Sequence, residues 1–124
     1  MNNDLNTPRT LSATTIVGDR VFDPEGQDVG RIHELMLDLN NGRIAYAVLS
    51  FGGFLGIGDR LFALPWDLLT LDAPNHAFVL DVTREQLESA PGFDKNHWPD
   101  FADPTFHELA YRHWGQEPYW LREG

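Results

Sequence analysis

The fold is decided by residues 40–50, which read NNGRIAYAVLS. Asparagine and glycine accept the positive φ angles that a tight turn between antiparallel strands requires. The residues after the turn, 43–50, include Ile, Tyr, Val and Leu and contain neither glycine nor proline, which is typical of a strand. This segment therefore predicts a β-hairpin.

The strand that enters this turn is expected over residues 28–39, because apolar residues recur at every second position from Leu35 onward. Residues 31–33 interrupt the alternation and predict a β-bulge. Further upstream, residues 23–26 read DPEG and predict a tight turn after a short strand at 20–22.

The chain after the hairpin repeats the same pattern of short strands. A strand is expected over 59–64 and should end at Pro65 or lie on an edge, because proline cannot donate a ladder hydrogen bond. One helical turn at 66–69 and a second hairpin formed by 70–72 and 77–82 follow. About six short strands predict an all-β fold, a small barrel or sandwich in which closure removes exposed edges.

The pattern becomes helical beyond Val82. Thr83 with Gln86 three residues later is a capping box, which predicts a short helix stopped by proline and glycine at 91–92. Asp103 as cap and Pro104 at the first helical position predict a second helix that runs to about Trp114.

The C-terminal tail, 93–124, is too rich in aromatic residues for a disordered segment. We expect it to pack on the barrel or on a second subunit, with Phe106, Leu109 or Ala110, and His113 on one face of its helix. The predicted organisation is thus a flexible N-terminus at 1–10, a barrel domain at 11–92 and an aromatic helical tail.

Charge and composition exclude several classes of function. The 124 residues carry 9 Lys and Arg against 19 Asp and Glu, a net charge of −10, so nucleic acid and anionic membranes should be repelled. Cysteine is absent, which excludes disulfides, thiol catalysis and Cys-type zinc sites. The N-terminus has no secretory signal and no apolar run approaches the ~18 residues of a membrane span, so we expect a cytoplasmic protein without membrane insertion.

Residues 11–93 resemble the PRC-barrel family, named from the cytoplasmic part of the photosynthetic reaction centre H subunit. The residues that carry the resemblance are GQDVGRI at 26–32, GRIAYAVL at 42–49, FGGFLG at 51–56 and FALPW at 62–66. Free-standing bacterial members also end in an aromatic tail with Pro-Tyr-Trp, here 118–120. The resemblance implies a small, strongly bent barrel that docks proteins and performs no covalent chemistry. It also raises an alternative, an accessory of photosynthetic electron transport.

No catalytic, cofactor-binding or metal-binding residue is predicted. The acidic residues Asp19, Asp23, Glu25 and Asp28 lack the ligand spacing of a calcium loop and predict a solvated turn. The histidines likewise lack a metal-ligand spacing; they are His33, His76, His97, His107 and His113. No serine has the setting of a nucleophile. A hydrolase remains an alternative only if distant carboxylates meet in a pocket.

The candidate function is protein binding by apolar side chains in two segments. The glycine-dense loop 52–58 carries large apolar residues that either fill the end of the barrel or form an interface. Self-association as a homodimer is expected. The interface candidates from the loop and the tail are Phe51, Phe54, Leu55, Ile57, Tyr111, Trp114, Tyr119 and Trp120.

Overall fold

The structure is a computed structural model that describes residues 7–52 and 60–122. Its elements in chain order are α1 (Ala13–Ile16), β1 (Arg20–Phe22), β2 (Asp28–Asp38), β3 (Arg43–Phe51), β4 (Arg60–Pro65), the 3-10 turn η2 (Trp66–Leu68), β5 (Leu69–Asp72), η3 (Ala73–Asn75), β6 (Ala77–Leu80), α2 (Arg84–Ser89), α3 (Pro104–His113) and η4 (Tyr119–Leu121).

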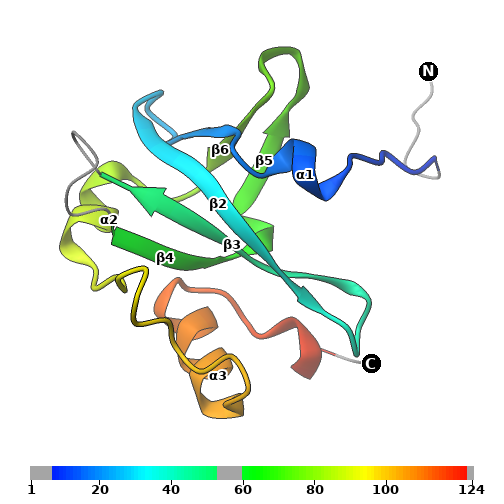
Figure 1. Cartoon of the computed structure of the whole chain (residues 1–124), viewed down its shortest axis with the longest axis vertical. Coiled ribbons are helices and arrows are strands. Elements are labelled where there is room, and N and C mark those ends of the chain that lie inside the picture. Colours follow the sequence, from blue (N-terminus) through cyan, green and yellow to red (C-terminus); the bar gives the residue numbers. More distant parts are fainter. Residues whose placement is uncertain (1–6, 53–59, 123–124) are drawn as a thin grey trace.

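The strands form one bent sheet in the order β4-β3-β2-β1-β6-β5. Neighbouring strands are antiparallel except β1 and β6, which are parallel. The predicted hairpin around residues 40–42 is confirmed as β2 and β3, and the second hairpin as β5 and β6. In Figure 1 the long β2 crosses the molecule, with β3 and β4 on one side of it. The architecture is a sheet-dominated half-barrel with a few helices.

The expected closure of the barrel by hydrogen bonds is wrong for the described strands, since β4 and β5 are two separate edges. β4 ends at Pro65, which lacks an N–H, and η2 then leads directly to β5. The outer edge of β4 is therefore not met by β5. The β4 edge is instead covered by Phe93, whose backbone exchanges two hydrogen bonds of 2.8 Å with Leu61.

The long strand β2 is bent by two irregularities in its pairing with β3. One lies between Ile32 and Glu34, which confirms the predicted bulge at 31–33. The other lies between Met36 and Leu37 and was not predicted. Such bulges increase the local twist and help a sheet to curve.

The main core lies inside this curved sheet and is sealed by α1 and α2. Ile16 of α1 and Leu87 of α2 are both buried in it. The helix α1 was missed by the sequence analysis, although Ser12 accepts a hydrogen bond from the Thr15 backbone N–H as its cap. The capping box of α2, formed by Thr83 and Gln86, is confirmed.

The tail packs against the sheet of its own chain. α3 packs beside β4, and η4 returns toward the turn between β2 and β3 (Figure 1). Asp103 caps α3 and Pro104 begins it, as predicted.

The expected helix face is partly correct, because Phe106 and Ala110 pack against the sheet, whereas Leu109 is 65% exposed and His113 is also exposed. The buried Tyr111 was not assigned to that face. Residues 94–103 contain neither helix nor strand, so only part of the tail is helical.

Candidate functional site

The eight predicted interface residues fall into three groups. Phe54, Leu55 and Ile57 lie outside the described residues, as does most of the predicted flexible N-terminus. Phe51 and Tyr111 are 3% and 1% exposed and belong to the two cores of the chain. The remaining three are partly buried against the same chain; they are Trp114, Tyr119 and Trp120.

Tyr46 of β3 is the centre of the contact between sheet and tail. Its side chain is fully buried, and its ring centroid lies 5.4 Å from that of Tyr111 and 5.7 Å from that of Phe101. Edge-to-face geometry of this kind adds to the free energy gained by burying the rings. The tail aromatics are therefore used, at least in part, to hold the tail on its own sheet.

A short chain of hydrogen bonds runs through this cluster. The Nε2 atom of His107 lies 2.7 Å from the carbonyl oxygen of Phe101, and Nδ1 lies 2.7 Å from the Tyr46 hydroxyl. A carbonyl only accepts, so Nε2 donates to Phe101, and Nδ1 is left within hydrogen-bond distance of the Tyr46 hydroxyl. Burial raises the pKa of Tyr46 far above its usual 10.0. This hydroxyl therefore stays protonated and serves as a structural donor.

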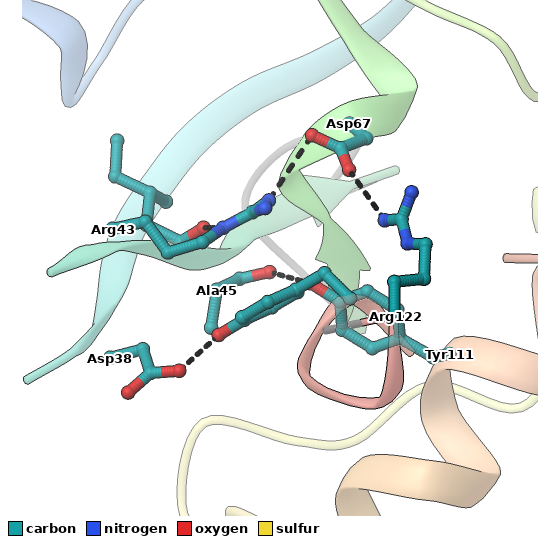
Figure 2. Close-up of polar contacts among 8 residues, drawn as sticks. Asp38, Arg43, Ala45, Asp67, Tyr111 and Arg122 are labelled. Carbon is teal, nitrogen blue, oxygen red and sulfur yellow. Dashed lines mark hydrogen bonds and ion pairs between the residues drawn. The ribbon is translucent and has the colours of Figure 1, made fainter. Parts of the chain in front are cut away.

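A second polar network fastens the end of the tail to the hairpin (Figure 2). The Tyr119 hydroxyl donates to the carboxylate of Asp38, and the Arg43 guanidinium lies 3.8 Å from the centroid of the Tyr119 ring. Asp67 accepts from Arg43 at 3.1 Å and lies 3.8 Å from Arg122. These contacts join β2, β3, η2 and η4 at one end of the molecule.

The titration of this network follows from its hydrogen bonds. Donation from Tyr119, together with bonds from Asn41 and Asn40, lowers the pKa of Asp38 from 3.8 to about 2, against the opposing effect of burial. Burial, followed by the hydrogen bond to Asp38, raises the pKa of Tyr119. Asp38 is thus ionised and Tyr119 neutral at pH 7.

Tyr111 provides a third connection between tail and sheet. Its hydroxyl donates to the carbonyl oxygen of Ala45 at 2.6 Å, as drawn in Figure 2. Burial raises the pKa of Tyr111, so the donor keeps its proton at any physiological pH.

A cleft of about 550 Å³ opens between these contacts and the outer side of the hairpin. We call it the hairpin–tail cleft. Among its lining residues Asp38 is the one carboxylate and His107 the one histidine. The lining residues are Met36, Leu37, Asp38, Leu39, Asn40, Asn41, Ala45, Tyr46, Phe101, Pro104, His107, Tyr119 and Trp120.

Two further clefts lie among the described residues, and neither brings two carboxylates together. The one between β4 and α3 is lined largely by apolar and aromatic side chains, without a carboxylate, and Trp114 and Leu109 contribute to it. The other, beside the start of β2, is lined by one carboxylate, that of Asp28.

Acidic side chains converge in one place in the described part of the chain, at Asp23, Glu25 and Glu85. Asp23 is buried and accepts from the backbone N–H groups of Glu25, Gln27 and Arg84 at 2.8–3.0 Å. Burial alone raises the pKa of Asp23, but these three donors outweigh it and lower the value below 3.8. Asp23 therefore shapes the turn after β1 and anchors the start of α2.

The polar contacts of the site could not be predicted from the sequence. Tyr46 and His107 are 61 residues apart, and Asp38 and Tyr119 are 81 apart. The pairs have no local spacing signal, because they meet only after the tail has folded back onto the hairpin.

Comparison with known proteins gives one family match. The model of the PRC-barrel domain matches residues 8–87. No protein in the curated set matches. A solved structure, described as a putative 16S ribosomal RNA processing protein, RimM, from Pseudomonas aeruginosa, is 18% identical with a TM-score of 0.46, and the match covers 67% of this chain. The chain spans half the length of that protein.

The comparisons give no support to the predicted exclusion of nucleic acid, which rests on net charge alone. Within the described residues, no helix combines the length and the apolar character needed to cross a membrane.

Proposed function

Because the chain belongs to the PRC-barrel domain family, we propose that it is a non-enzymatic domain that docks onto other proteins. The observation that carries the proposal is the state of the titratable groups in the hairpin–tail cleft. Asp38, Tyr46 and His107 are each engaged in hydrogen bonds to their own chain. These bonds give all three groups a part in holding the tail on the hairpin, which supports a structural role for them.

The hydrolase alternative needs two carboxylates that converge on one concave site. Each of the three clefts described above is lined by at most one carboxylate. Where three acids do converge, Asp23 is buried and already accepts three backbone hydrogen bonds. These placements favour docking over hydrolysis.

Self-association is the finer part of the proposal. The tail aromatics pack on their own sheet, so support for a homodimer comes from other side chains. Several large apolar residues of the described chain are exposed, and burying them against a second copy would gain free energy. They include Leu37, Leu39, Leu109 and Leu121. No observation favours the photosynthetic alternative.

Affinity purification of the tagged full chain from its source, with quantified co-eluting proteins, tests docking. We expect at least one protein to be retained in a fixed ratio to the chain, and sedimentation of the pure chain at micromolar concentration to show a dimer. A chain that retains no protein, stays monomeric and converts a metabolite over time would contradict the proposal.

A further inference from the structure

The tip of the hairpin formed by β2 and β3 contains a chemically labile pair of residues. Asn41 is the one asparagine of the chain that is followed by glycine. Asparagine is a thermolabile residue, and a glycine after it favours deamidation, because glycine has no Cβ to hinder its backbone nitrogen and adopts a wide range of backbone angles. Asn41 and Gly42 are both exposed in the turn, where water, the other reactant, reaches them.

Deamidation converts the side-chain amide to an acid in two steps. The backbone nitrogen of Gly42 loses its proton and bonds to the side-chain carbonyl carbon of Asn41, while the bond from that carbon to Nδ2 breaks and Nδ2 leaves as ammonia. Water then opens the resulting succinimide ring to aspartate or isoaspartate. Either product carries a carboxylate in place of the amide.

The amide of Asn41 contacts the carboxylate that holds the end of the tail. Its Nδ2 atom donates to Oδ2 of Asp38 at 2.8 Å, and the Tyr119 hydroxyl donates to the same oxygen. Deamidation removes one of these two donors and places a second carboxylate beside Asp38. Because two neighbouring carboxylates disfavour each other's ionised form, the pair must separate or take up a proton. Either change disturbs the oxygen to which Tyr119 is bonded.

The intact turn slows the reaction. The Gly42 N–H donates to the carbonyl oxygen of Asp38 at 2.9 Å, so the attacking nitrogen is engaged. The backbone N–H and the amide of Asn41 are both bonded to the Asp38 carboxylate, so the attacked group is held as well. Asn41 therefore reacts when the tip of the hairpin opens, and its acidic product cannot donate to Asp38 as the amide does.

We propose that Asn41 is a site of spontaneous deamidation and that its conversion to an acid releases η4 from the hairpin. This inference concerns how long the tail stays fastened, and so goes beyond the proposed docking function. The release is confined to the end of the tail, because α3 is held separately. Tyr111 of α3 packs against the ring of Tyr46 and donates to the carbonyl oxygen of Ala45.

The test ages the full chain in mildly alkaline buffer and identifies each new acid by mass spectrometry of its peptides. Anion exchange separates the deamidated fraction by its added charge, and hydrogen–deuterium exchange then compares η4 and α3 in the two fractions. Asn41→Asp and Asn40→Asp form a matched pair of variants. Each adds one negative charge to the exposed turn, but Asn40 contacts Asp38 through its backbone N–H, whereas Asn41 also contacts it through its amide.

We expect acid to accumulate at Asn41 before it does at Asn40, Asn75 or Asn96. In the deamidated fraction and in N41D, the amides of η4 should exchange about tenfold faster than in the unmodified chain, whereas N40D should stay within about twofold and α3 should be unchanged. The proposal is overturned if another of these asparagines reacts first, if η4 is as protected in the deamidated fraction as in the unmodified chain, or if N40D loosens η4 as much as N41D.

Discussion

Gly30 of β2 lies directly against the backbone of β3. Its φ is +132°, and a Cβ atom added there would lie 1.9 Å from the carbonyl oxygen of Ser50. Gly26 also has a positive φ, +82°, but nothing lies within 4 Å of its Cβ position. An added methyl group would therefore meet both backbone strain and steric overlap at Gly30, but only backbone strain at Gly26.

Gly30→Ala should destabilise the chain by about 3 kcal/mol or more, since both strain and overlap with a backbone atom oppose the methyl group. Gly26→Ala should cost only about 1 kcal/mol of strain. Urea denaturation measures both. Equal losses in the two variants would show that the strands are not this close.

Tyr119 and Asp38 make stability depend on acid pH. Because the pKa of Asp38 is about 2 in the folded chain and 3.8 without the contacts, its contribution is complete above pH 4 and is lost as pH falls toward 2. Tyr119→Phe removes the largest cause of the shift. The variant should lose less stability between pH 4 and pH 2 than the wild type.

Thermal midpoints measured from pH 2 to pH 7 check this expectation. Tyr111→Phe is the matched control, because its hydroxyl bonds a neutral carbonyl and its loss should lower stability without changing the acid dependence. An unchanged acid dependence in Y119F would place the hydroxyl away from Asp38.

Local residue signals were the most predictable part of the chain. The helix caps are examples. The side chain of Thr83 accepts from the backbone N–H of Gln86, and that of Asp103 accepts from Thr105, so the partners are two to three residues apart and sequence spacing alone identifies the caps. Ser12 shows the limit of this approach, because its helix α1 has only four residues and no periodicity.

At the scale of elements, the hairpins could be predicted from their turn residues, whereas the packing of the tail depends on tertiary contacts. The sequence analysis placed Phe106, either Leu109 or Ala110, and His113 on one face of the helix. Phe106 and Ala110 pack in the tail cluster as expected, but the cluster also buries Tyr111, which was not assigned to that face, and leaves Leu109 exposed. Which face of a short helix is buried depends on its neighbours as well as on its own sequence.

The docking of α3 gives a matched pair of variants on one helix. Tyr111→Ala should lower the free energy of unfolding by about 3 kcal/mol, because it empties a buried aromatic site and removes a hydrogen bond. Leu109→Ala, at a 65% exposed position, should stay within about 0.5 kcal/mol of the wild type. Guanidinium denaturation distinguishes them, and similar losses would mean that α3 packs through another face.

Net charge governs self-association at the scale of the whole molecule. Two chains of charge −10 repel, and added salt screens that repulsion. A dimer held by apolar side chains should therefore become tighter when salt rises from 0.05 M to 0.5 M. Sedimentation equilibrium measures the constant, and weakening with salt would indicate an interface built on ion pairs.

The overall topology was the least predictable property. Six strands and their hairpins were expected, yet whether a sheet closes depends on the pairing of its two edges. The outer edge of β4 is covered by Phe93, which belongs to none of the six strands. A pattern of alternating apolar residues does not predict such a contact.

Hydrogen–deuterium exchange of the full chain, free and in complex with a protein that it retains, tests the docking function most directly. We predict that α3 is already protected in the free chain and that the complex adds protection along residues 36–41 of the hairpin. A tail that is unprotected until the partner binds, or a chain whose exchange changes only with a metabolite that it converts, would contradict the account.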